Sequence, residues 1–470
     1  MKSLKLSRYL VYIFTFLIFY SVSVMSIFAF DLAQHVDIPS SFNPLGSGAR
    51  ALGMGGAFIA IADDATAASW NPGGLIQLEH PEMSIVYNYT KRKEDNRFSS
   101  SISDTYDNHY SDVDLNNINY LSVSYPFSTF DHNMIISLNM QHLYNFSYNG
   151  EFTMFDRKIE EELYSSRYSF EIEQDGDIYA LGVAFGLQIS PRISIGATLN
   201  YWGDTFFNNG WSNNYNQLST NYSSLFSMEG TLIQQEDFCF DGWNFNLGMM
   251  WQVNDKWSIG CVFKSPFTAD IDHSLRLITS KKISLQFPTD IAQNDDLNFP
   301  VNENFESDNR IEFNENIDMP MSYGIGFAYR CSDKITLSSE IYRTHWEDFI
   351  YTKQNGTELS PITARSVEQS DIDTTTWYRF GGEYLIIGSQ WVVPIRAGFF
   401  YDPAPASGSP DNYYGFSLGS GVAYKRWIFD VAFTYRFGDD VGKDIFQIEN
   451  IDFSKDVNEY NLYASIIVHL

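Results

Sequence analysis

The sequence is poor in charged residues, in cysteine and in long apolar runs. Charged residues make up only 19% of its 470 residues, and the three cysteines, Cys239, Cys261 and Cys331, are widely separated with no C-x-x-C pair. This scarcity argues against a disulfide framework and against a metal site. Beyond the N-terminal region no apolar run is long enough to span a membrane, and the mean hydropathy is -0.23. A bundle of membrane-spanning helices is therefore excluded.

Positive charge is also scarce, because 30 basic residues stand against 58 acidic ones and the net charge is -28. Nucleic-acid phosphates are bound mainly by Lys and Arg, and anionic lipid surfaces likewise attract basic segments. We therefore expect neither a nucleic-acid partner nor peripheral docking on anionic lipid.

Aromatic residues are abundant. They form 17% of the chain, with 30 Tyr and 38 Phe, a composition that suits strands and membrane interfaces. The N-terminus carries Lys2, Lys5 and Arg8, followed by an apolar run over 9–30 with a small residue at Ala29. We predict that residues 1–29 are a secretory signal peptide. The alternative is a retained single-helix anchor.

Apolar and polar residues alternate along most of the chain after residue 80. In the segment that begins at Trp243, Trp243, Phe245 and Leu247 share one face, and Asn244 and Asn246 share the other. Such alternation over about ten residues predicts a strand with one apolar face. We predict fourteen strands, at residues 81–90, 118–127, 133–144, 177–189, 192–202, 243–253, 256–265, 320–330, 333–345, 375–387, 391–401, 413–424, 427–437 and 460–469.

The gaps between these strands alternate between long and short. Two-residue gaps such as 190–191 and 254–255 alternate with long gaps such as 145–176, 203–242 and 266–319, which we predict to be loops. A soluble sandwich also alternates, but this rhythm indicates an all-β, transmembrane, antiparallel up-and-down β-barrel of about 14 strands, with short periplasmic turns and long outer loops. An even strand number places both termini in the periplasm. The acidic loop before the last strand is a solvated rim or, alternatively, a site where divalent cations bridge to lipid.

The stretch from Gly46 to Leu75 opens with Gly46-Ser47-Gly48-Ala49-Arg50-Ala51, a loose G-x-G-x-x-G/A pattern. A dinucleotide site needs that pattern between a strand and a helix of a βαβ unit. Pro39 and Pro44 precede it and no βαβ pattern follows, so a nucleotide site is not expected.

The stretch instead resembles the N-terminal signature of the FadL/TodX (OMPP1) family of outer-membrane transport proteins for hydrophobic compounds. The matching residues are 48–57, 62–65 and 70–75, and a second match begins at Pro394-Ile395-Arg396-Ala397-Gly398. The resemblance implies a fourteen-stranded barrel closed by an N-terminal hatch, with the hatch at 30–80 and the barrel at 81–470. It also implies insertion by the barrel-assembly machinery, although the C-terminal Leu470 is not the usual aromatic residue.

The hatch is rich in small residues. Gly53, Gly55 and Gly56 allow close backbone packing in a crowded lumen, and Asp63 or Asp64 is expected to cap a short helix over 65–70 that Asn71, Pro72 and Gly73 end. Together with Asn71, Pro72 and Gly73, these three glycines are the predicted gating residues. An inert plug is one interpretation, and a plug that shifts to admit ligand is the one we favour.

A G-x-S-x-G pattern at 415–419 is typical of a nucleophile elbow, which needs a strand-to-helix turn. Here Gly415, Ser417 and Gly419 alternate on the small face of a predicted strand, and the eight histidines are scattered. We therefore expect no enzyme activity, no catalytic residue and no cofactor.

Arg379, Glu383 and Arg396 lie opposite the apolar face of their strands and are predicted to point into the lumen, since ionised groups facing lipid are costly. A two-residue turn would place Gly381 opposite Arg396, with Glu383 diagonal to it. The set is either a structural ion pair or a ligand-binding site in which an arginine steers a carboxylate.

We expect passive uptake of hydrophobic small molecules, such as long-chain fatty acids or aromatic hydrocarbons, by a monomer in outer-membrane lipid. A non-transporting scaffold is the first alternative, because shuttle proteins of type IX secretion also look like this family. A general porin is the second. An apolar lumen would favour uptake of hydrophobic molecules, and a wide polar lumen would favour a general porin.

Overall fold

A computed structural model describes residues 46–100, 105–107, 110–158, 164–222, 226–285, 302–444 and 451–470. The expected signal peptide at 1–29, and residues 30–45 of the expected hatch, lie outside the described residues. Within the described ranges, no helix is long and apolar enough to cross a membrane.

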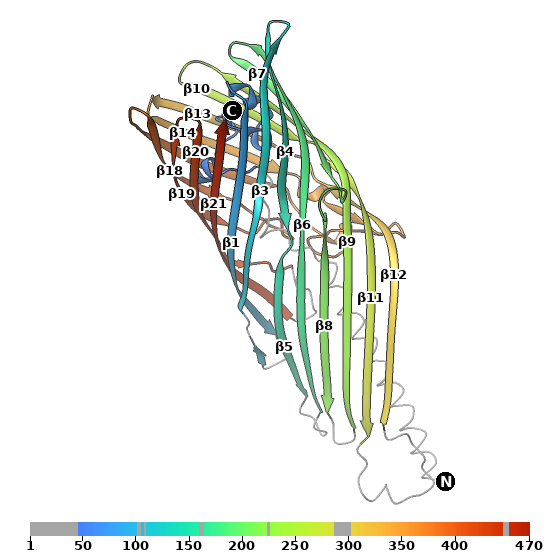
Figure 1. The fold of residues 1–470 in the computed structure, drawn as a ribbon. Helices are drawn as coiled ribbons and strands as arrows, with labels where there is room; N and C mark the ends of the chain where they lie inside the picture. The colour runs from blue at the N-terminus through green and yellow to red at the C-terminus, as the bar shows by residue number, and fades with distance from the viewer. Residues whose placement is uncertain are drawn as a thin grey trace, which may run out of the picture.

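The strands form one closed antiparallel sheet (Figure 1). Strand β1 (Glu82–Ser100) pairs on one side with β3 (Tyr110–Thr129) and on the other with β21 (Ile451–His469), the last strand of the chain. This pairing closes the ring, so the predicted all-β barrel of fourteen strands is confirmed. The other eleven strands of the ring are β4 (His132–Asn145), β6 (Tyr164–Ser190), β7 (Ile193–Trp202), β9 (Phe226–Gln252), β10 (Trp257–Lys264), β13 (Ser322–Ser332), β14 (Ile335–Thr344), β17 (Thr375–Ile387), β18 (Trp391–Tyr401), β19 (Tyr414–Tyr424) and β20 (Trp427–Val441).

One side of the wall continues far beyond the ring. Strands β6 and β9 are each 27 residues long, and four further strands flank or continue them, so this side reaches well past the opposite side in Figure 1. We call this part the outer extension. The added strands are β5 (Tyr148–Lys158), β8 (Gly210–Tyr222), β11 (Phe267–Leu285) and β12 (Asn302–Met319). Three short strands lie beside them, β2 (Thr105–Asp107), β15 (Ile350–Thr352) and β16 (Glu358–Leu359).

The prediction that 145–176, 203–242 and 266–319 are loops is therefore largely wrong. These residues alternate as regularly as the ring strands do, but their outward residues are mostly polar, as Asp237 and Asp241 are on β9. Polar outward residues do not face lipid, so the expectation of an apolar face missed them.

The ring itself carries the apolar belt that the sequence predicts. On β9 the outward side chains of Trp243 and Leu247 are 56% and 45% exposed, whereas Asn244 and Asn246 are buried on the inward face. The belt ends at Trp243, because the next outward residues toward the outer end are polar. The ring is thus the membrane-spanning part, and the outer extension lies beyond it.

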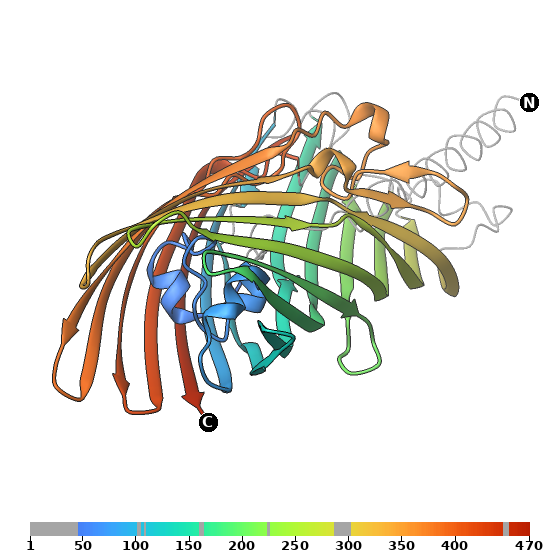
Figure 2. The same cartoon turned by 90° about the horizontal axis from the view of Figure 1, so that it is seen from above.

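The N-terminal segment lies inside the ring, where Figure 2 shows its helices enclosed by strands. Its elements are α2 (Ala49–Gly53), α3 (Ala67–Trp70) and the 3-10 helix η1 (Pro72–Gln77). The side chains of this segment, small alanines and large residues such as Phe58 and Trp70, form one buried cluster with inward residues of the wall, such as Tyr120 and Met250. Two more 3-10 helices, η2 (Trp346–Asp348) and η3 (Val367–Gln369), lie between β14 and β17.

Candidate functional site: the hatch and the lumen beside it

The hatch, the described segment 46–77, turns sharply after α2. Gly55 and Gly56 have φ values of 68° and 74°, a region that L-residues with side chains rarely adopt. The backbone N–H of Gly55 donates to Ser417 Oγ at 2.8 Å, and Ser417 Oγ donates to the carbonyl of Gly53 at 3.0 Å. The Ser of the G-x-S-x-G pattern therefore binds the hatch backbone.

The second turn of the hatch is built by side chains that bind nearby backbone. Asp64 Oδ1 accepts from the N–H and the hydroxyl of Thr66, at 2.8 and 2.6 Å, and α3 begins at Ala67. Asp64 thus closes a turn before the helix, and the predicted cap is wrong in position, since no side chain caps α3. Asn71 accepts from Gly73 N–H at 3.0 Å, and Pro72 starts η1, so this motif begins a new helix where the prediction only ended one.

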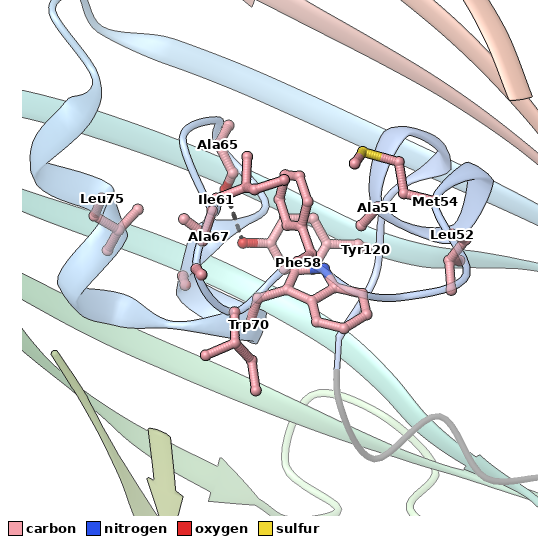
Figure 3. Close-up of a cluster of buried hydrophobic side chains, with 14 of the residues drawn as sticks. Ala51, Leu52, Met54, Phe58, Ile61, Ala65, Ala67, Trp70, Leu75 and Tyr120 are labelled. Carbon is pink, nitrogen blue, oxygen red and sulfur yellow. Dashed lines mark hydrogen bonds between the residues drawn. The ribbon is translucent and has the colours of Figure 1, made fainter. Parts of the chain in front are cut away.

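The hatch is fastened to the wall by hydroxyl groups. Besides Ser417, inward hydroxyls on four further strands donate to hatch carbonyls, and Figure 3 shows one of these bonds, from Tyr120 to Ala65. The shortest bond from each of these four strands is Tyr120 to Ala65 at 3.0 Å, Ser194 to Gly73 at 2.7 Å, Ser258 to Ala60 at 2.9 Å and Ser338 to Ala57 at 2.7 Å. The Glu340 carboxylate adds two acceptor contacts, to the N–H groups of Phe58 and Ile59, both at 3.0 Å.

Wall glycines let the hatch backbone approach the strands. A Cβ at Gly196, Gly260 or Gly398 would lie within 2.3 Å of a hatch backbone atom, so a side chain there would displace the hatch. The regularly placed inward glycines therefore mark where the hatch backbone packs against the wall.

An ion network holds two of the three predicted ligand residues. Arg396 Nε lies 2.7 Å from Glu383 Oε2, and Arg396 Nη1 lies 2.5 Å from Asp430 Oδ1. Arg50 of the hatch joins Glu383 at 3.3 Å and Asp63 at 2.5 Å. The network therefore ties the hatch to the wall, and sequence reasoning missed the parts of Arg50, Asp63 and Asp430 in it.

The predicted register at this point is wrong. Glu383 pairs directly with Arg396, and Gly381 pairs with Gly398, because the last pair of the ladder is Ile387 with Val392, which leaves the four residues 388–391 in the turn. Arg379 lies apart from the Arg396–Glu383 pair, 3.8 Å from Asp402 and over the ring of Trp377. The ligand-binding role of Arg379, Glu383 and Arg396 stays a prediction, as does the gating role of the hatch residues.

Beyond the hatch, inward aromatic rings form three tiers across neighbouring strands. The inner tier, next to the ring, joins Trp202 to Tyr144, Phe240 and Phe267 with centroids 5.2 to 6.1 Å apart. The middle tier is Phe146, Trp211, Phe238, His273 and Phe313, at 4.3 to 5.2 Å. The outer tier is Phe453, Phe98, Phe152, Phe170 and Tyr215, at 4.6 to 6.1 Å. Strong period-two placement of these rings was the signal that sequence reasoning overlooked.

Between the inner tier and the hatch lies a narrow polar collar. A cavity of about 50 Å³ is lined there by side chains that include Gln141, Asn200, Asn244 and Lys264. This cavity combines amide groups with the ring of Trp202.

The ladder between β3 and β4 stops part-way along the wall. It runs from Thr129–His132 to Tyr120–Gln141, whereas β3 remains paired with β1 as far as Tyr110. At the point where the ladder stops, β4 carries a register shift against β6 between His142 and Tyr144. Within the described strands, no further β3–β4 pair follows.

Comparison with known proteins gives one family and several solved structures of similar fold. A family model described as outer membrane protein transport protein (OMPP1/FadL/TodX) matches residues 41–458. No curated protein matches the sequence. The chain is similar in fold to a Pseudomonas aeruginosa FadL homologue (12% identity, TM-score 0.58) and to the Pseudomonas putida toluene transporter TodX (13%, 0.53). A third similar structure is the CymD monoaromatic hydrocarbon channel (16%, 0.51), and each match covers 91% of this chain and 99% of the other.

Proposed function

The chain belongs to the OMPP1/FadL/TodX family of outer-membrane transport proteins, and on that premise we propose that it admits fatty acids or aromatic hydrocarbons by passive uptake. The observation that carries the proposal is the set of three aromatic tiers on the inward face of the outer extension. A π-lined surface binds apolar solutes by burying their area, with no need for a specific polar contact.

The route in this proposal runs from the aromatic tiers to the polar collar and then to the break in the β3–β4 ladder. The hatch closes the direct path, because bonds from strands on opposite sides of the ring hold it. A solute that reaches the collar can pass sideways between β3 and β4, where no ladder bond must be broken, and enter the bilayer. A shift of the hatch is then needed only near the collar.

We further propose that the short turns and both termini face the periplasm and that the protein acts as a monomer. The experiment is an epitope tag at Asn355, an exposed position beside the outer extension, with a matched tag at Asp255 in the β9–β10 turn. Only the first should bind antibody on intact cells. Labelling of the second alone would reverse the orientation.

Uptake can be separated from the two rival functions with one assay. Cells that express the protein are given naphthalene and, separately, a sugar of similar size, and uptake is compared with that of cells lacking it. Faster uptake of naphthalene alone supports the channel. Faster uptake of both indicates a porin, and no change in either indicates a scaffold.

A further inference from the structure

A second cavity lies in the outer extension, away from the hatch. Its volume is about 460 Å³. That is within the roughly 300–1,000 Å³ of small-molecule sites, and well above the roughly 150 Å³ that encloses benzene. One wall is the middle aromatic tier, from Trp211 to Phe313, and the opposite side is the β15–β16 hairpin with Leu359 and Pro361. The cavity therefore has room for a ligand of one or two rings.

The polar groups of the cavity form one cluster. His273 Nδ1 lies 2.8 Å from Glu315 Oε2, and His273 Nε2 lies 3.4 Å from Glu236 Oε1. Tyr351 donates its hydroxyl to Glu315. Burial lowers the pKa of His273, but hydrogen bonds and charge from Glu236 and Glu315 outweigh it and raise this pKa to about 9. His273 is therefore an imidazolium at neutral pH.

The charges of the cavity balance. Its ionised lining groups are Glu236, Glu315, His273 and Lys353, two negative and two positive. No excess positive charge is present to hold a carboxylate, and no excess negative charge to hold a cation. A neutral ligand is the class that this balance favours.

Two of the buried polar atoms on the cavity wall are suited to a ligand hydroxyl. Trp211 is 5% exposed and Glu236 is 4% exposed. In the part of the chain that the structure describes, Trp211 Nε1 and Glu236 Oε2 have no hydrogen-bond partner. The two residues are diagonal neighbours on one face, because Trp211 pairs with Phe238 and Asn213 pairs with Glu236. One is a donor and the other an acceptor, and a buried group without a partner costs free energy.

We propose that this cavity binds neutral aromatic compounds that carry a hydroxyl group. A phenolic hydroxyl can accept from Trp211 Nε1 and donate to Glu236 Oε2, while its ring stacks on the middle tier. The site would collect such solutes before they reach the inner tier, so the inference rests on the proposed uptake function and names the ligand class of its outer end.

The test uses three probes with the same ring system: 2-naphthol, naphthalene and 2-naphthoate. Their binding to the full-length protein in nanodiscs is measured by equilibrium dialysis and corrected with empty nanodiscs. We expect 2-naphthol to bind roughly 10- to 100-fold more tightly than naphthalene, the range for a hydrogen bond to a charged group. We expect 2-naphthoate to bind most weakly. Equal binding of naphthol and naphthalene, or strongest binding of naphthoate, would overturn the proposal without any variant.

Two variants locate the site. Trp211→Phe keeps a ring and removes the donor, and Glu236→Gln keeps the shape and removes the charge. Each should bring naphthol affinity close to that of naphthalene, whereas Glu229→Gln, on the outward face of the same strand, should change neither. Unchanged naphthol selectivity in both site variants would place the binding elsewhere. Naphthalene uptake by the wild type separates the proposed binding site from the proposed uptake function. Uptake persists if only the binding site is assigned wrongly, and it is absent if the protein is not an uptake channel.

Discussion

Some strands run through both the ring and the outer extension, but their apolar side chains face outward in the ring and inward in the extension. On β9, the ring half has Trp243, Phe245 and Leu247 outward, and the extension half has Phe238 and Phe240 inward. Strand geometry is the same in both halves, and only the medium outside differs, lipid for one and water for the other. The comparison teaches that period-two alternation reveals a strand, while the polarity of the outward set reveals what surrounds it.

The largest expected effect comes from removing the hatch from the ring. Removal of residues 46–75 should leave a folded barrel that leaks small polar solutes, because the wall closes through β1 and β21 without the hatch. Conductance in planar bilayers measures the leak, and heat-modifiability on gels reports folding. Ser338→Ala, which removes one of the fastening hydroxyls, is the control and should stay closed. An unchanged conductance after the deletion would show that the hatch does not seal the pore.

The ion pairs of the two regions should respond very differently to the loss of an arginine. Arg396→Gln leaves Asp430 buried without a cation and removes one of the two arginines that pair with Glu383, so it should cost about 3–5 kcal/mol in the free energy of unfolding. Arg276→Gln in the extension breaks an exposed pair with Asp308 and should cost nothing measurable. Chemical unfolding in vesicles compares the two variants.

The same Arg396→Gln variant also tests the predicted ligand role. If Arg396 steers a carboxylate, fatty-acid binding should fall while binding of an uncharged hydrocarbon is spared. Equal loss of both, in a barrel that is still heat-modifiable, would leave Arg396 a structural role only.

A charge placed on the outward face should measure where the lipid ends. Leu247→Arg lies in the apolar belt and should cost about 2–4 kcal/mol, whereas Asp237→Arg, outward on the same strand, should change stability by less than about 0.5 kcal/mol. The free energy of unfolding in lipid vesicles is the measurement. Similar costs at both positions would mean that lipid also covers the extension.

The smallest effect is a pH dependence confined to the extension. The pKa of His273 is raised to about 9, so its ion pairs contribute full stability below the unfolded pKa near 6.5 and lose it as pH rises through about 9. The wild type should therefore lose more stability between pH 6.5 and 9.5 than His273→Gln does. Thermal unfolding of both proteins at the two pH values gives the difference, and parallel curves would contradict the assigned charge of His273.

The sequence predicts the ring well because lipid imposes one rule on every strand. Residues such as Trp243, Phe380 and Phe433 are outward by that rule, and each pattern can be read locally. The extension was missed because its outward residues, such as Asp237 and Asp241, face water and are polar. A strand beside water has no apolar outward face by which the sequence could distinguish it.

The candidate site was predictable only in part, because its contacts join distant residues. The hatch glycines and Arg396 stand out in motifs, but Glu340 binds Phe58 across 282 residues, and no local pattern connects them. The register of Glu383 and Arg396 depended on two more residues in the turn than the sequence suggested. Local patterns show which residues share a face of a strand. Which residues of two strands lie opposite each other depends on the whole fold.

The seam between β1 and β21 also makes closure of the ring a long-range event. The ring closes only when the last strand of the chain pairs with the first, the two ring strands that lie furthest apart in the sequence. Contacts between such remote segments form slowly, since a long loop must be closed before they are gained. The hatch precedes β1 in the chain, and its bonds reach strands as far along the chain as β19, so it too is held by contacts between remote segments. The glycines and hydroxyls of the wall are where those contacts are made.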